Sequence, residues 1–248
     1  MKRRSRFAAV AVVALACARF ANAASPSPSP TPATPAAAAP SAVPTPSVPD
    51  ASYIPNEARV FAAQGNKAFE AGKYEEAKAA YQAVLKLVPE NLVGLVNLGT
   101  VYYRMQDYAA AEKTLRQAVR VRLETAPAWM TLGLVYLDQQ KLDDALAAFG
   151  QSVAIDPRNA RAHNYLGVTV GRKGWNDAAE SELRRALEID PGYSEAHFNL
   201  AVFYLERKPP AIELARRHYK RATELGAERD PLLEKEIAAA QSAATPAP

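Results

Sequence analysis

The sequence has few of the side chains that metal sites and nucleophilic catalysis use most. It contains one cysteine, Cys17, and only three histidines, which are His163, His197 and His218. These residues show no spacing typical of a metal site, and the chain has neither a glycine-rich phosphate loop nor a Ser–His–Asp order. The composition therefore argues against an enzyme and predicts no metal or other cofactor.

Acidic residues are missing from the N-terminus. Residues 1–23 carry several basic residues, then an apolar run from Phe7 to Ala18, then the small-x-small sequence Ala21-Asn22-Ala23. The apolar run is shorter than the ~20 residues that a membrane-spanning helix needs. The pattern is typical of a cleaved export signal. We predict cleavage between Ala23 and Ala24 and a mature protein in the periplasm, with no membrane span.

Removal of this leader changes the net charge. The whole chain has 30 basic and 26 acidic residues, and five of the basic ones lie in residues 1–23. The mature chain would therefore have 25 basic residues (30 − 5) against 26 acidic ones, a net charge of −1. A nearly neutral domain lacks the electrostatic footprint of a nucleic-acid-binding protein. We expect no nucleic-acid partner.

Cys17 allows a second interpretation of the leader. Ala14-Leu15-Ala16-Cys17 resembles a lipoprotein box, in which the cysteine becomes the acylated first residue. Ala14 departs from the leucine that this motif prefers, so Ala21-Asn22-Ala23 fits its own motif better. The alternative to a soluble periplasmic protein is thus an outer-membrane lipoprotein with a lipid on Cys17.

A proline-rich segment follows the leader. Residues 24–52 consist mostly of Pro, Ala, Ser, Thr and Val. Proline fixes its own φ and has no amide donor, so neither a helix nor a sheet can run through such a segment. We predict a disordered, semi-rigid spacer. An unselected disordered tail is the alternative that the composition leaves open.

The rest of the chain repeats with a period of 34 residues, counted from starts at Ala58, Leu92, Ala126, Ala160 and Ser194. The eighth place of the repeat is glycine in the first four repeats, and the twentieth is alanine. The twenty-fourth place is large and apolar, namely Tyr81, Leu115, Phe149 and Leu183. Because a glycine within a helix costs ~1 kcal/mol relative to alanine, its recurrence indicates close approach of a second helix. We expect the alanines to face these glycines.

The repeat boundaries carry helix-ending and helix-capping signals. Prolines such as Pro89 and Pro157 stop the second helix, and Asn91, Thr125 and Asn159 stand where each can cap the next. In the fifth repeat Ala215, Tyr219 and Ala222 recover the second-helix pattern two residues late, after an insertion near Pro209-Pro210. Trp175 lies one place before the position where an aromatic residue recurs, so its indole is expected to be displaced by one place.

This register resembles the tetratricopeptide-repeat family, from Ala58 to about Asp230. The resemblance implies an all-α fold, a right-handed α-solenoid of five 34-residue helix-turn-helix repeats with a C-terminal capping helix. The array spans 56–230, with repeats at 58–91, 92–125, 126–159, 160–193 and 194–229, the capping helix at 231–241 and a disordered tail at 242–248.

In this family the first helices line a concave groove that binds a polypeptide, so the resemblance implies a non-enzymatic adaptor or scaffold. Carried over place by place, the partner-binding groove consists of Asn66, Phe69, Val96, Asn97, Tyr103, Arg104, Met130, Leu134, Leu137, Asn164, Tyr165, Arg172, Phe198 and Asn199. Two hypotheses remain: a periplasmic peptide- or protein-binding adaptor, or a lipid-anchored outer-membrane scaffold for pilus or secretion-complex assembly. For any one of these residues, a place in the helix–helix core is the alternative to binding. The partner's identity and the oligomeric state are left open.

Overall fold

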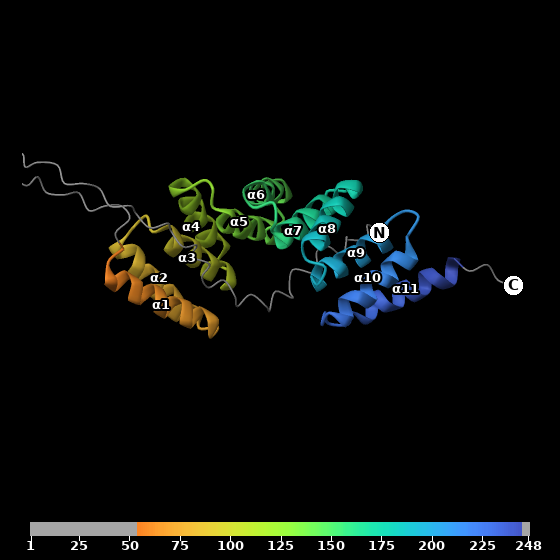
Figure 1. Ribbon diagram of the computed structural model, residues 1–248, viewed down its shortest axis with the longest axis horizontal. Coiled ribbons are helices and arrows are strands. Elements are labelled where there is room, and N and C mark those ends of the chain that lie inside the picture. The colour runs from red at the N-terminus through yellow and green to blue at the C-terminus, as the bar shows by residue number, and fades with distance from the viewer. Residues whose placement is uncertain (1–53, 245–248) are drawn as a thin grey trace, which may run out of the picture.

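The computed structural model describes residues 54–244, which form an α-solenoid of paired helices without any strand (Figure 1). The predicted leader, spacer and extreme C-terminus lie outside these residues, including the predicted signal cleavage at Ala23–Ala24 and the lipidation at Cys17. The helices are α1 (Asn56–Glu70), α2 (Tyr74–Leu87), α3 (Leu92–Arg104), α4 (Tyr108–Val121), α5 (Ala126–Asp138), α6 (Leu142–Ile155), α7 (Ala160–Arg172), α8 (Asn176–Ile189), α9 (Ser194–Glu206), α10 (Ile212–Glu224) and α11 (Pro231–Ala244).

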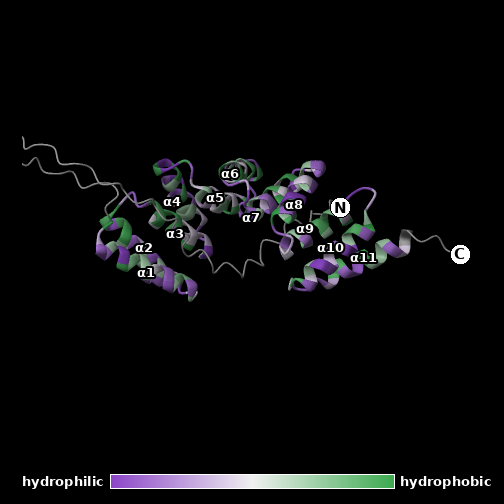
Figure 2. Ribbon diagram, in the orientation of Figure 1, coloured by the Kyte–Doolittle hydropathy of each residue, from purple (hydrophilic) through white to green (hydrophobic). Residues whose placement is uncertain are grey.

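Each repeat is one pair of packed helices, and the pairs stack in chain order, so that α2 contacts α3 and α4 contacts α5. The first helices α3, α5, α7 and α9 also contact one another in sequence. Hydrophobic and hydrophilic residues alternate around the same helices in Figure 2. This pattern is expected when each helix buries one stripe against its neighbours.

The repeated glycine marks the tightest contact within a repeat. A Cβ on Gly133 would lie 2.5 Å from Cε1 of Phe149, which is fully buried. Gly65, Gly99 and Gly167 meet the twenty-fourth-place side chain of their own repeats in the same way. The predicted close approach is confirmed, but the nearest neighbour of the glycine is the large side chain. The alanine at the twentieth place is also fully buried, one helical turn away.

The helix caps follow the sequence signals with one exception. The side chains of Asn91 and Asn159 accept hydrogen bonds from the amides of Gly94 and Ala162, at 2.7 Å and 3.0 Å. The prediction for Thr125 is wrong, because its hydroxyl donates to the carbonyl of Arg122 at 2.8 Å instead of capping α5. The bond turns the hydroxyl back toward the preceding segment, so that it cannot accept from the first turn of α5.

The turn inside each of the first four repeats needs a left-handed residue at the fifteenth place. Gly72 and Gly174 fill it with φ of 72° and 84°, whereas Gln106 and Gln140 adopt φ of 61° and 62°. Glycine adopts this conformation without steric cost, whereas a residue with a Cβ adopts it only with a steric penalty. Two of these turns are therefore locally strained.

The C-terminal end of the stack is closed by α11. Leu233 and Ile237 are buried in a cluster with Ala201, Val202 and Tyr219. The carboxylate of Asp230 accepts from the amides of Leu232 and Leu233 at 2.9 Å and 3.0 Å and so caps the helix. This helix extends to Ala244, three residues beyond the bound expected from the sequence.

Of two further expectations for the later repeats, the one for the fifth repeat is met and the one for Trp175 is not. The lengthened turn between Glu206 and Ile212 is present, and Ala215, Tyr219 and Ala222 are buried after it, as the delayed pattern predicts. Trp175, however, does not replace the expected aromatic one place later. It precedes α8, is 51% exposed, and lies under the ammonium of Lys173 at 5.1 Å.

Candidate protein-binding face

The predicted binding residues lie on the first helices α1, α3, α5, α7 and α9, and we call the side that they form the first-helix face. Nine of these residues are exposed or partly exposed. They are Asn66, Phe69, Val96, Asn97, Tyr103, Arg104, Tyr165, Arg172 and Phe198. The other five, Met130, Leu134, Leu137, Asn164 and Asn199, are between 1% and 8% exposed.

The buried members belong to the core. Met130, Leu134 and Leu137 pack in the cluster that joins α3 to α6. Helix α5 contacts helices on several sides, so most of its surface is covered. These three side chains therefore do not form an open contact surface, as the sequence had led us to expect. They are buried and support the first-helix face from beneath.

Asparagine and tyrosine side chains are linked at the N-terminal part of the face. Tyr81 donates its hydroxyl proton to Oδ1 of Asn66 at 2.7 Å, and Asn97 donates to the same oxygen at 3.4 Å. Burial raises the pKa of Tyr81 to about 12. The protonated phenol and the amide of Asn97 thus share one acceptor, which holds the side chains of Asn66 and Asn97 together at the surface.

The centre of the face combines phenols with a charged pair. The ring centroids of Tyr103 and Tyr108 are 6.2 Å apart, and Tyr108 donates to Oδ2 of Asp138 at 3.5 Å. Burial and the neighbouring Asp138 raise the pKa of Tyr103. Burial also raises the pKa of Asp138 and lowers that of Arg172, although each opposes the other's shift by mutual attraction. Arg172 donates to Gln140 as well.

The charges on this face follow the repeat. The thirteenth place is Glu70, Arg104, Asp138, Arg172 and Glu206 in the five repeats, so the sign alternates from one repeat to the next. Two adjacent members, Asp138 and Arg172, attract each other. The row has three carboxylates and two guanidinium groups, so it adds no strong attraction for a ligand of either charge.

Aromatic contacts continue toward the C-terminal end. Tyr165 stacks on Phe149 with centroids 5.7 Å apart, and the guanidinium of Arg161 lies 5.6 Å from the Tyr165 ring. Phe198 packs on Tyr219 at 6.2 Å. The rings of Tyr165 and Phe198 are partly exposed and are held from behind by the buried rings of Phe149 and Tyr219, which is the arrangement of an apolar contact surface.

Asn164 and Asn199 form a buried amide pair. Asn199 donates to Oδ1 of Asn164 at 2.8 Å, and the two residues are only 1% and 2% exposed. Nδ2 of Asn164 and Oδ1 of Asn199 have no hydrogen-bond partner among the described residues. A donor and an acceptor therefore remain unsatisfied just beneath the first-helix face.

The histidines pack within their repeats. His163 contacts Oε2 of Glu182 at 2.7 Å, and Nδ1 of His197 lies 2.9 Å from Nδ1 of His218, a pairing that the sequence did not suggest. Burial lowers the pKa of His197, and burial together with that neighbour and two arginines lowers the pKa of His218 to about 4. Residues 54–244 contain no group of three His, Cys, Asp or Glu side chains that could hold a metal ion.

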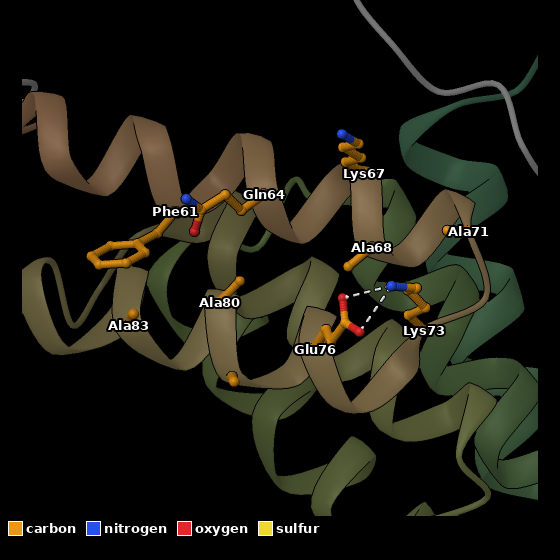
Figure 3. Close-up of a pocket in the computed structure, with 10 residues that line it drawn as sticks. Phe61, Gln64, Lys67, Ala68, Ala71, Lys73, Glu76, Ala80 and Ala83 are labelled. Carbon is orange, nitrogen blue, oxygen red and sulfur yellow. Dashed lines mark hydrogen bonds and ion pairs between the residues drawn. The ribbon is translucent and has the colours of Figure 1, made fainter.

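A hollow of about 690 Å³ lies at the other end of the molecule, between α1 and α2 (Figure 3). Phe61, Gln64 and Ala68 line it together with the Lys73–Glu76 pair, whose charged atoms are 3.0 Å apart. In the next repeat, Leu98 stands in the register of Gln64 and packs in the cluster that contains Tyr81 of α2. The hollow is thus the uncovered end of the stack, and none of the fourteen predicted residues lines it.

Paired helices with a shared 34-residue register and a glycine–large contact in each repeat define a helical-repeat protein. Tetratricopeptide-repeat models match residues 96–160, 130–194 and 182–224, and a further TPR repeat model matches residues 65–106. Together these matches run without a gap from residue 65 to residue 224. The chain belongs to the tetratricopeptide-repeat family.

Solved structures show the same fold. PilW, described as a widely conserved type IV pilus biogenesis factor, is 20% identical with a TM-score of 0.69, over 77% of this chain and 88% of that one. PilF of Pseudomonas aeruginosa is 16% identical with a TM-score of 0.67, over 75% and 85%. MamA of Desulfovibrio magneticus RS-1 is 21% identical with a TM-score of 0.61, over 70% and 97%. No curated protein matches the chain.

Arrays of this family are protein–protein interaction modules, and this chain is one of them. Its partners are proteins or peptides. None of the described helices has both the length and the hydrophobicity that crossing a membrane requires.

Proposed function

We propose that the chain is an exported adaptor of the bacterial cell envelope, and that its first-helix face binds a polypeptide segment of a partner protein. The observation that carries the proposal is the row of accessible aromatic and amide side chains from α1 to α9, held in place by contacts beneath. Catalysis forms no part of this function.

The chemistry of the face favours an apolar, weakly charged segment. Phe69, Tyr103, Tyr165 and Phe198 offer rings for apolar side chains, and Asn66 and Asn97 offer amides to a main chain. The alternating charges at the thirteenth place add little net attraction for an acidic or a basic ligand. We therefore expect binding to weaken only slightly as salt is raised.

A site-specific photo-crosslinker tests where the partner binds. A benzophenone amino acid replaces Tyr103 on the first-helix face in one variant, and Lys113 on the exposed side of α4 in a matched control. Illumination of cells is expected to yield a discrete crosslinked species from position 103 and none from position 113. Crosslinks from position 113 alone would place the binding surface on the second helices.

Affinity is tested with the partner that crosslinking identifies. Tyr103→Ala combined with Phe198→Ala removes two partly exposed rings and is expected to weaken binding at least tenfold, since aromatic anchors dominate such interfaces. Lys113→Glu should leave the affinity unchanged. Circular dichroism and thermal melting of both variants check that the fold is retained. Equal affinity of the double variant and the wild type would contradict the proposal.

Cys17 supports a second candidate, a lipid-anchored scaffold at the outer membrane that serves pilus or secretion-complex assembly. It rests on the lipoprotein-like sequence before Cys17, since the likeness to PilW and PilF concerns the fold alone. Mass spectrometry of the mature N-terminus separates the two. Ala24 as the first residue supports the soluble periplasmic adaptor, whereas an acylated Cys17 supports the scaffold.

A further inference from the structure

A polar contact between second and first helices joins the second repeat to the third. Nε of Arg116 in α4 donates to the hydroxyl of Tyr136 in α5 at 3.1 Å, and the same guanidinium pairs with Glu112 at 3.0 Å. Glu112 also pairs with Lys141 across the joint at 3.4 Å. Carboxylate, guanidinium and phenol form a directional triad whose geometry fixes how one repeat sits on the next.

The same triad recurs two repeats later. Arg184 of α8 donates to the hydroxyl of Tyr204 in α9 at 3.0 Å and pairs with Glu180 at 2.8 Å. Tyr204 donates in turn to Glu180 at 2.9 Å. In both joints the three groups occupy the twenty-first, twenty-fifth and eleventh places. The first joint keeps a simpler version, in which Gln82 donates to the hydroxyl of Tyr102 at 3.0 Å.

The joint between the third and fourth repeats lacks these groups. Its twenty-first, twenty-fifth and eleventh places are Leu146, Gly150 and Val170. None of these side chains can form a hydrogen bond. Leu146 packs on the cluster that contains Val170, and a Cβ on Gly150 would meet no atom of the described residues within 4 Å. Apolar contact is non-directional, so it holds the two surfaces together without fixing their angle.

The core continues across this joint through apolar contacts. Ala162 of α7 belongs to the cluster of α3 to α6, and Leu166 packs both on that cluster and on the next one, which runs from Val168 in α7 to Ala215 in α10. Besides the Tyr165–Phe149 stack, the polar links lie at the turn end, where Arg172 meets Gln140 and attracts Asp138, and Lys173 meets Asp143. Gln140 and Asp143 are exposed, and pairs with exposed partners contribute at most ~1 kcal/mol.

We propose that the joint between α6 and α7 is the hinge of the solenoid, about which repeats one to three move as one body against repeats four and five. Asp138 of the third repeat and Tyr165 and Arg172 of the fourth stand on opposite sides of it. Bending there changes the spacing at the centre of the first-helix face. The hinge is a property of the free protein and does not depend on the proposed function.

Spin labels can measure this motion cleanly, because residues 24–248 contain no cysteine. The twenty-second place is exposed in four successive repeats, at Ala79, Lys113, Ala147 and Ser181. Labels at Lys113→Cys and Ser181→Cys span the hinge, and labels at Ala79→Cys and Ala147→Cys span an equal number of repeats without it. Both pairs lie on the order of 20 Å apart, two packed layers of helices. Electron–electron resonance should give a broader distance distribution for the pair across the hinge.

Two engineered changes make the test reciprocal. Leu146→Glu, Gly150→Arg and Val170→Tyr together install the triad at the hinge, and should narrow the distribution to the width of the control pair. Tyr136→Phe with Arg116→Met removes the triad from the second joint, and should broaden the control pair. Equal widths for the two pairs in the wild-type background would overturn the hinge, whether or not the triple variant folds. No narrowing in a folded triple variant, judged by circular dichroism, would overturn the role of the triad.

Discussion

Two glycines in the middle of consecutive helices should respond to the same substitution in opposite directions. Gly133 lies in α5, where an added Cβ would approach Cε1, Cδ1 and Cζ of Phe149 to 2.5, 2.6 and 2.8 Å. Gly150 lies in α6, where an added Cβ would meet nothing in residues 54–244 within 4 Å. Alanine improves helix propensity by ~1 kcal/mol at either position. The sign of the net effect therefore depends on the steric contact alone.

The magnitude follows from what can move. Phe149 is completely buried, with 0% exposure, and its ring is stacked on Tyr165. Relief of the steric clash therefore requires displacement of this packed ring or of the α5 backbone. Overpacking of this kind costs ~1–3 kcal/mol, so Gly133→Ala should lower the free energy of unfolding by up to ~2 kcal/mol after the gain in propensity. The larger Gly133→Leu should cost at least as much. Gly150→Ala should raise the free energy by ~0.5–1 kcal/mol.

Urea unfolding followed by circular dichroism at 222 nm measures both variants against the wild type. A Phe149→Ala background provides the control, because the cost of Gly133→Ala should disappear once the ring is absent. If Gly133→Ala stabilised the protein in the wild-type background as Gly150→Ala does, the close contact would not explain the recurrence of glycine at the eighth place.

Three smaller predictions concern local features. The folded-state pKa of His218 is lowered to about 4, below its unfolded value of ~6.5, so protonation favours the unfolded state and stability should fall as pH drops from 6.5 toward 4. His218→Gln should reduce this acid loss in melting experiments relative to the wild type. Gln106→Gly should raise the melting temperature, since relief of a left-handed residue with a Cβ gains ~1 kcal/mol. Asn159→Ala should cost ~1 kcal/mol by removing the cap of α7, whereas Asn159→Asp, which can accept the same bond, should not.

The 34-residue register was sufficient to predict the helix pairs, because each repeated residue type has a local cause. Glycine marks a close contact, proline ends a helix, and Asn91 or Asn159 begins one. The prediction for Thr125 failed because a hydroxyl has more than one backbone partner within reach, and the choice depends on the path of the preceding turn. Two further features follow the same 34-residue period and could have been sought in the sequence. They are the left-handed residue at the fifteenth place and the triads at places eleven, twenty-one and twenty-five.

Exposure on the first helices was harder to predict than the helices themselves. Leu134 and Tyr165 both stand at places that the family uses for binding, yet Leu134 is 7% exposed and Tyr165 is partly exposed. The difference depends on the sizes of neighbouring side chains in adjacent repeats, which a periodic pattern does not encode. A glutamate at Leu134 would disrupt the core and could not test binding.

The Asn164–Asn199 pair allows packing and binding to be separated in one experiment. Within residues 54–244, Nδ2 of Asn164 and Oδ1 of Asn199 are buried without partners, and each unsatisfied group costs ~1–3 kcal/mol. Replacing both amides by apolar residues of similar size removes both costs together with the single 2.8 Å bond between them. Asn164→Leu with Asn199→Leu should therefore leave the free energy of unfolding unchanged or raise it by ~1–2 kcal/mol, whereas either single replacement should lower it, because it strands the other amide.

Binding of the crosslinked partner then shows what the amides are for. If the double variant is as stable as the wild type but binds the partner at least tenfold more weakly, the two amides are exposed by small shifts of α7 and α9 on binding and contact the ligand main chain. If the double variant binds normally, the pair serves only to set the register between the fourth and fifth repeats. A double variant less stable than both single variants would contradict the assignment of two unsatisfied atoms. Each single variant keeps one buried amide without its partner, whereas the double variant keeps none and should not be the least stable of the three.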